Sequence, residues 1–90
     1  MVLVQFTRHL RVHFPDLAER TVRAGSLSEI VGQLDAAHPG LAGYLLDDQG
    51  GLRPHVNIFI NDELLHDRGR LSDPVKDGDR VFVMQALSGG

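Results

Sequence analysis

A chain of 90 residues with a formal net charge of −3 and no cysteine excludes several classes of protein. Its length allows one domain with a modest core and little room for a deep catalytic cleft. The lack of cysteine removes disulfides, thiolate metal sites and a cysteine nucleophile, and the negative charge argues against a nucleic-acid partner. No stretch reaches the roughly 18 apolar residues of a membrane-spanning helix, and no signal peptide is recognisable. We therefore expect a cytoplasmic protein with no membrane partner.

The first quarter of the chain predicts two strands joined by a loop. Residues 2–6 alternate between apolar and polar positions, as in a half-buried strand, and residues 20–24 resume a short alternation. We expect these two segments to pair as an antiparallel hairpin. Pro15 cannot donate to a sheet ladder, so residues 7–19 are expected to form a loop, anchored by Leu10. The basic side chains of this loop form either a solvated face or a small positive patch for an acidic partner.

A capping box marks the start of the main helix. The hydroxyl of Ser26 can accept a hydrogen bond from the amide of Glu29, and the Glu29 carboxylate can accept one from the amide of Ser26. The apolar positions that follow keep the spacing of an amphipathic helix: Leu27, Ile30, Val31, Leu34 and Ala37. Pro39 and Gly40 end this helix, and residues 41–46 are expected to form a further short turn of helix.

The second half of the chain predicts three further strands. Residues 55–60 alternate, a turn at residues 61–62 follows, and residues 63–66 form a short strand. The last strand, residues 80–86, follows a tight turn at residues 77–79. Because the aspartates of this tight turn lack the ligand spacing of a calcium loop, we expect no bound metal.

After the last strand the chain ends on four residues: Leu87, Ser88, Gly89 and Gly90. The two glycines place the terminal carboxylate on a tether with few steric limits, which can enter a channel too narrow for side chains. Four extended residues reach roughly 13 Å. We therefore divide the chain into a folded domain, residues 1–86, and a flexible tail, residues 87–90, suited to delivering a carboxylate into another protein's active site. Ordinary fraying of a terminus is the simpler alternative.

An Asp-Gly-Asp turn, one apolar strand and a terminal diglycine follow one another over residues 77–90. With the strand and helix order, they resemble the β-grasp fold of ubiquitin-like proteins, which is α+β: one mixed sheet of four to five strands with one main helix across one face. More closely, the chain resembles the MoaD/ThiS sulfur-carrier family, which includes the small subunit of molybdopterin synthase and the thiamine sulfur carrier. Residues 55–63 are similar to the carrier of a cysteine-synthesis pathway. One departure is Gln85, near which family members often have proline.

This resemblance implies a carrier and not an enzyme. An E1-like adenylyltransferase activates the Gly90 carboxylate with ATP, and sulfur then displaces AMP to leave a C-terminal thiocarboxylate. A sulfur-accepting synthase of cysteine, molybdopterin or another sulfur metabolite receives the sulfur. The chain itself is expected to hold no permanent cofactor, because ATP is used by the partner enzyme.

The sheet face opposite the main helix is expected to carry an apolar patch: Leu3, Phe59, Phe82 and Met84. Aromatic and methionine side chains on an exposed face are typical of an interface. We hypothesise that this patch docks the activating enzyme. Two alternatives are that the loop at residues 47–54 covers the patch, or that the strands have the opposite phase.

Two other functions fit the same residues. The activated Gly90 can be attached to a lysine through an isopeptide bond, which would make the chain a ubiquitin-like protein modifier. Alternatively, the chain is a β-grasp interaction module in which the diglycine has no role. The first alternative requires the same adenylation as sulfur transfer, so the sequence does not separate these two.

Overall fold

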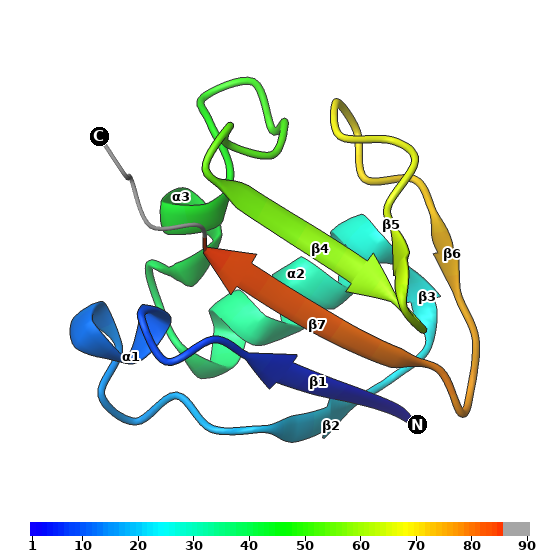
Figure 1. The fold of residues 1–90 in the computed structure, drawn as a ribbon, viewed down its shortest axis with the longest axis horizontal. Coiled ribbons are helices and arrows are strands. Elements are labelled where there is room, and N and C mark those ends of the chain that lie inside the picture. The colour runs from blue at the N-terminus through cyan, green and yellow to red at the C-terminus, as the bar shows by residue number, and fades with distance from the viewer. Residues whose placement is uncertain (86–90) are drawn as a thin grey trace.

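The computed structural model describes residues 1–85, and Figure 1 shows its helices and strands in space. In chain order the elements are β1 (Val2–Phe6), α1 (Leu10–His13), β2 (Arg20–Val22), β3 (Gly25–Ser26), α2 (Leu27–Ala37), α3 (Leu41–Leu45), β4 (Val56–Ile60), β5 (Glu63–Leu64), β6 (Pro74–Val75) and β7 (Arg80–Gln85).

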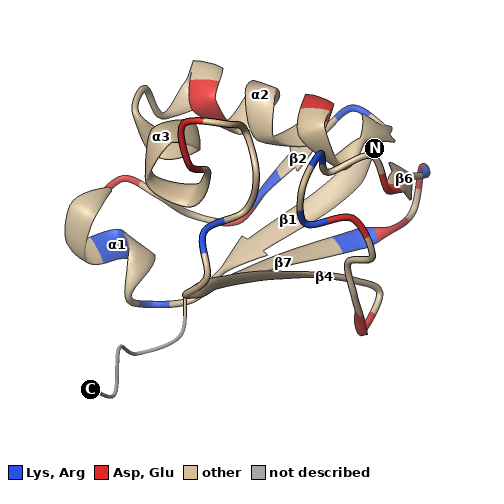
Figure 2. Ribbon diagram, turned by 90° about the horizontal axis from the view of Figure 1, so that it is seen from above, with Lys and Arg blue, Asp and Glu red and all other residues tan. Residues whose placement is uncertain are grey.

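Five of the strands form one mixed sheet in the order β2-β1-β7-β4-β5. The central pair, β1 and β7, is parallel, whereas the other neighbours are antiparallel. Helices α2 and α3 lie on one side of this sheet, and the other side carries no helix of the described chain (Figure 2). The α+β fold with a mixed five-stranded sheet and one main helix is thus confirmed, including the hairpin of β1 and β2.

Helix α2 begins with the capping box that the sequence predicts. The Glu29 amide donates to Ser26 Oγ at 3.1 Å, and the Ser26 amide donates to Glu29 Oε1 at 2.9 Å. The helix ends at Ala37, which is exposed, so this last position of the predicted apolar stripe lies outside the core. On its outer edge, the side chain of Gln33 bonds both the amide and the carbonyl of Arg23, which ties the helix to the end of β2.

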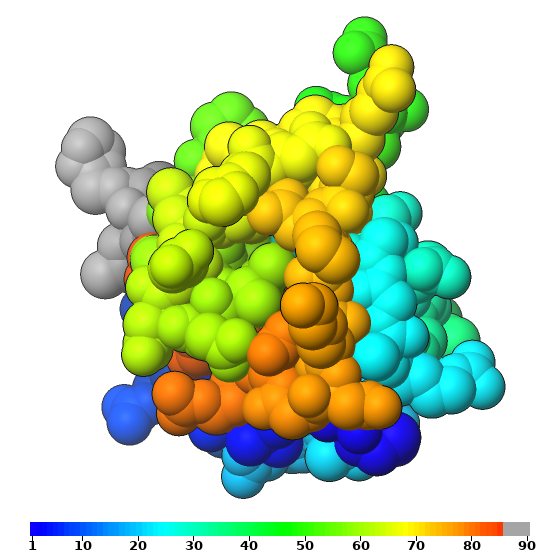
Figure 3. Space-filling model, turned by 90° about the vertical axis from the view of Figure 1, so that its right-hand side faces the viewer, coloured from blue at the N-terminus to red at the C-terminus, as the bar shows by residue number. Residues whose placement is uncertain are grey.

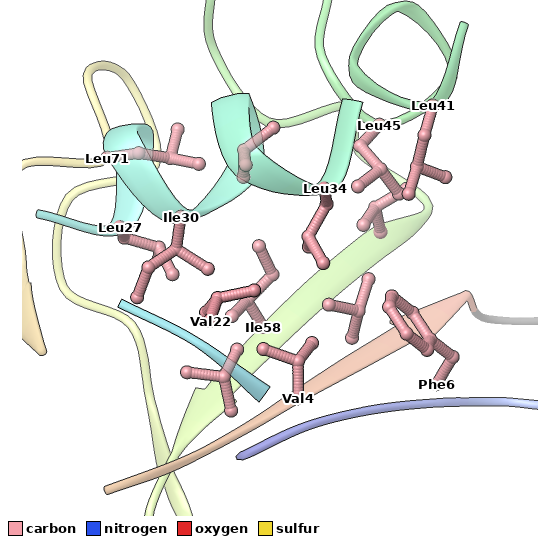
Figure 4. Close-up of a cluster of buried hydrophobic side chains, with 14 of the residues drawn as sticks. Val4, Phe6, Val22, Leu27, Ile30, Leu34, Leu41, Leu45, Ile58 and Leu71 are labelled. Carbon is pink, nitrogen blue, oxygen red and sulfur yellow. The ribbon is translucent and has the colours of Figure 1, made fainter. Parts of the chain in front are cut away.

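The core fills the space between α2 and the sheet (Figure 4). From the helix it receives Ile30 and Leu34, and from the sheet it receives Val4, Ile58 and Val83, all at most 1% exposed. The alternation of β4 and β7 therefore has the predicted phase, with the remaining side chains of these strands turned to the helix-free face. No helix in the described part of the chain is long and apolar enough to span a membrane.

The structure corrects the prediction for residues 7–19. This segment contains helix α1, in which Leu10 is fully buried as expected. A turn comes first, since the amide of Leu10 donates to the carbonyl of Thr7 and that of Arg11 to Arg8. A helix of four residues is too short for a hydrophobic period to appear in the sequence, so only its buried anchor was predictable.

A second correction concerns Gly25 and Pro74, which the sequence places outside any strand. Gly25–Ser26 and Pro74–Val75 pair as an antiparallel two-stranded sheet, β3 with β6. This pair joins the start of α2 to the segment before β7. Each strand has only two residues, which is too short for an alternation to be recognised.

The turns at the start of β7 are held together by the carboxylate of Asp79. Its Oδ2 accepts from the amide of Lys76, and its Oδ1 accepts from the side-chain amide of Asn61, each at 2.8 Å. Asn61 in turn accepts from the amide of Arg80 at 2.9 Å. The bond from the Lys76 amide, followed by that from Asn61, lowers the pKa of Asp79 below its ordinary value.

Acid is therefore expected to destabilise the domain through Asp79. A carboxylate whose pKa is lower in the folded than in the unfolded state stabilises the fold above the unfolded pKa, and this contribution is lost as the pH falls through the folded value. The pKa of Glu29 is lowered by hydrogen bonds from Ser26, and its contribution has the same sign. We expect the urea midpoint to fall between pH 7 and about pH 3, and to fall less in D79N. Equal pH dependence of the two proteins would contradict this role of Asp79.

Candidate functional site

The helix-free face of the sheet carries a row of side chains in register across four strands. Gln5 lies opposite Phe82, Phe82 opposite Phe59, and Phe59 opposite Leu64. Phe82 is 36% exposed and Leu64 47%, although both are apolar. We call the six outward side chains around this row the open-face patch: Leu3, Gln5, Phe59, Leu64, Phe82 and Met84.

All four residues predicted for the apolar patch lie on this face. Leu3 and Met84 are half-buried and flank Phe82, the first on the neighbouring strand and the second further along β7. The loop at residues 47–54 is the one that could have covered them. It is instead bonded to the loop that contains Arg68, since the Leu52 amide donates to the carbonyl of Arg68. The exposure of Phe82 and the burial of Val83 show that the strand phase is the predicted one.

A hollow of about 330 Å³ opens in this face beside the two phenylalanines. Phe59 and Phe82 line it together with Gln5, and charged side chains stand around them. Among these, Arg80 Nη2 lies 3.9 Å from Asp62 Oδ2, with both side chains exposed. An apolar depression with polar groups beside it can receive an apolar anchor side chain from a partner protein.

Leu64 is the apolar residue of this surface that the sequence does not predict. The sequence places it in a short strand, residues 63–66, without assigning its side chain to either side of the sheet. The available sequence signal is the pair Asn61-Asp62, since both residue types tolerate positive φ, and in the structure they have φ of 54° and 84°, as in a two-residue hairpin loop. Such a loop fixes the register, so that Leu64 has to lie opposite Phe59.

The second part of the site is the end of β7 at Gln85, which is anchored on two sides. Its amide donates to Thr7 Oγ1 at 3.2 Å, and its side-chain Oε1 accepts from the hydroxyl of Tyr44 at 3.0 Å. The amide of Thr7 donates to the carbonyl of Val83, and Gln85 pairs with Val56 in the sheet. The last described residue is thus held by β1, β4 and α3 together.

Tyr44 is itself fixed by aromatic neighbours. The ring centroids of His13 and Phe14 lie 4.9 and 5.7 Å from that of Tyr44, and the His55 centroid lies 6.4 Å away. These contacts join α1, α3 and the start of β4 around the end of β7. The predicted tail residues Leu87, Ser88, Gly89 and Gly90 lie outside the described residues, as does the predicted domain boundary at residue 86.

Two exposed arginines stand near this end of the sheet. Arg8 follows Thr7 directly, and Arg11 lines a depression together with Phe82 and Glu19. Among residues 1–85, no carboxylate lies within 4.0 Å of either guanidinium. Both arginines are thus exposed, which fits a solvated face as well as the positive patch that the sequence allows. The same part of the chain contains no group of three His, Asp or Glu side chains placed to hold a metal ion.

Comparison with known proteins agrees with this geometry. The ThiS family model matches residues 5–90. The sulfur carrier protein CysO of Mycobacterium tuberculosis is 31% identical over 91 residues, covering 99% of this chain and 98% of that protein. Small archaeal modifier protein 3 of Haloferax volcanii is 36% identical over 66 residues, covering 72% and 70%. The crystal structure of the Amycolatopsis orientalis BexX/CysO complex contains a chain that superposes with a TM-score of 0.85 at 28% identity, with full coverage of both chains.

A mixed sheet with a single main helix across it, an open apolar face and a C-terminal central strand defines a ubiquitin-like β-grasp protein. Within that class, the chain belongs to the ThiS family of sulfur carriers.

Proposed function

We propose that the chain carries sulfur as a thiocarboxylate on the carboxyl carbon of Gly90. An E1-like adenylyltransferase transfers AMP from ATP to the Gly90 carboxylate and releases pyrophosphate, which turns the carboxyl oxygen into a good leaving group. A sulfur nucleophile then attacks the carbonyl carbon, and AMP leaves. In this scheme the folded domain supplies no acid, base or metal. It docks on the partner and delivers the reacting carboxylate in a fixed direction.

The observation that carries this proposal is the position of the open-face patch on the strand that leads to the C-terminus. Strand β7 carries Phe82 and Met84 of the patch, and the anchored Gln85 directly follows Met84. A partner that docks on Phe82 is therefore close to Gln85, the last described residue before the tail. We propose that the E1-like enzyme uses this face, with the half-buried Leu3 and Phe59 completing the contact.

The same surface is proposed to dock the sulfur-accepting synthase in a later step. The two partners must then bind in turn, because both need the tail and the patch. The acceptor belongs to a pathway that makes cysteine, molybdopterin or another sulfur metabolite, and the similarity of residues 55–63 favours the first. One of the neighbouring solved structures, the BexX/CysO complex, is an assembly of a related chain with a second protein.

Intact mass after activation tests the proposal. The chain is incubated with ATP, a sulfide source and an E1-like enzyme that is active on another carrier of the family. We expect a mass gain equal to the exchange of one oxygen for one sulfur, located at Gly90 by fragmentation. A chain shortened by Gly90 serves as the control and should gain nothing. An equal gain in the shortened chain, or none in the full chain, would contradict the proposed chemistry.

Protein modification is the second candidate function. It is favoured by the 36% identity to small archaeal modifier protein 3, a protein named as a modifier. Both functions start with the same adenylate, so they differ in the final acceptor. Conjugates of the chain with cellular proteins on an immunoblot, lost when Gly90 is removed, would support modification. A function that survives removal of Gly89-Gly90 would instead indicate an interaction module.

A further inference from the structure

The chain is almost free of amine nucleophiles. Of its nine lysine and arginine residues, eight are arginines and one is a lysine, Lys76. It has no cysteine. Arginine stays protonated at neutral pH and does not attack an acyl group, whereas a lysine amine can. The chain therefore offers two primary amines to an activated carboxyl group: the N-terminal amine and Lys76.

The two amines have different surroundings in the structure. The N-terminal ammonium of Met1 lies 2.7 Å from Asp77 Oδ1, in an ion pair. Lys76 is exposed, and among residues 1–85 no carboxylate lies within 4.0 Å of its ammonium. The main chain of Lys76 is nevertheless fixed, because its amide donates to Asp79 Oδ2 at 2.8 Å. An exposed amine without a close ion pair, on a turn whose main chain is fixed, is the more accessible acceptor.

Lys76 lies at the other end of β7 from Gln85, on a turn that borders the hollow of the open-face patch through Asn61 and Arg80. It precedes the first residue of β7, Arg80, whereas the end of β7 at Gln85 is at the opposite end of the strand. The orange segment leading into β7 is on the surface of the side view in Figure 3. A copy held at the end of β7 thus has the exposed side chain of Lys76 at the other end of that strand.

We propose that Lys76 is a modification site, at which an activated second copy of this chain acylates the first. The inference rests on the proposed function, because it needs the adenylate of Gly90. The uncharged amine Nζ of Lys76 attacks the carbonyl carbon of that adenylate, and a C–N bond forms. The bond from this carbon to the phosphate-bearing oxygen breaks, AMP leaves with the electron pair, and the nitrogen loses one proton to water. The product is an isopeptide bond between two copies.

One consequence is a single type of linkage. Because each copy has one lysine and one activated end, copies joined through Lys76 form unbranched head-to-tail multimers.

A second consequence is competition with sulfur. Sulfide and Lys76 attack the same carbonyl carbon, so a rising sulfide concentration lowers the yield of linked copies.

The test uses the full chain with the E1-like enzyme and ATP, without sulfide. Pyrophosphate release measures activation, the fraction of covalent dimer measures acylation, and peptide mass spectrometry locates the linkage. We expect a dimer linked from Gly90 to Lys76. In K76R, we expect unchanged pyrophosphate release and at least about tenfold less dimer, because arginine keeps the charge but lacks a nucleophilic amine. A double variant with Arg70→Lys added, at another exposed position, should form dimer again with the linkage at residue 70.

The outcomes distinguish a failure of the proposed adenylation of Gly90 from a failure of the proposed role of Lys76. No pyrophosphate release from the unmodified chain would contradict the proposed function itself. Pyrophosphate release without dimer would overturn the role of Lys76 and leave the proposed function standing. Dimer that persists in K76R, or that is linked through the amine of Met1, would also overturn it.

Discussion

Replacing Phe82 with aspartate is expected to lower kcat/KM for adenylation roughly 10- to 30-fold, the effect of losing a central interface residue. Phe82 is the most exposed aromatic of the open-face patch and lines the hollow beside Phe59. A carboxylate there removes the aromatic contact with the partner and would have to be desolvated when the partner docks. The loss should appear in KM, because the reacting end of the chain is unchanged. Initial rates of pyrophosphate release over a range of chain concentrations measure it.

The fold should tolerate this change, because the Phe82 side chain points away from the core. Thermal unfolding of F82D checks this, and a loss of up to about 1 kcal/mol is expected from the lower strand propensity of aspartate. Ala36→Asp is a matched control, since Ala36 is exposed on α2, on the other side of the sheet. If F82D and A36D are activated equally well, the docking surface lies elsewhere.

Leu34→Ala is expected to cost about 2–5 kcal/mol of unfolding free energy, as other large-to-small changes in a core do. Leu34 is fully buried and points from α2 into the core between helix and sheet (Figure 4). Alanine favours the helix more than leucine does, so the whole loss comes from burial and packing. Since a domain of this kind has about 5–15 kcal/mol in total, the variant should be near the limit of folding. Urea unfolding followed by circular dichroism measures the difference.

Gly32→Ala is the control on the same helix. Gly32 is exposed, and a Cβ added there meets no atom within 4 Å. The change should therefore stabilise the domain by about 0.5–1 kcal/mol through helix propensity alone. If L34A were as stable as the unmodified chain, the packing of α2 on the sheet would not be the main source of stability.

The local patterns of the sequence were sufficient for α2 and for the faces of the long strands. The pair Ser26 and Glu29 places the helix start because both partners of the capping box are within four residues of each other. The alternation of Ile58 with Phe59 assigns one to the core and the other to the open face, since side chains alternate along a strand. The four predicted patch residues and the core residues of the long strands could thus be predicted strand by strand.

Features that depend on distant residues were not readable in this way. Nothing local to Tyr44 shows that its hydroxyl bonds Gln85, 41 residues later. The pairing of Gly25 with Val75 likewise joins segments that show no strand pattern of their own. Alternation also gives the face of a strand without giving its neighbour, so it does not predict the parallel pairing of β1 with β7. Helix α1 was missed because its four residues, Leu10–His13, are too few for a helical period to be recognised within it.

The parallel pairing of β1 and β7 also has a consequence for the way in which the domain is made. The first strand to leave the ribosome has its central neighbour in the last strand, because β7 lies between β1 and β4. Contacts between residues so far apart in sequence slow folding and delay it until late in synthesis. A nascent chain that stops before β7 lacks the strand that joins the two halves of the sheet. The sheet can therefore close only once β7, which ends at Gln85, has been synthesised.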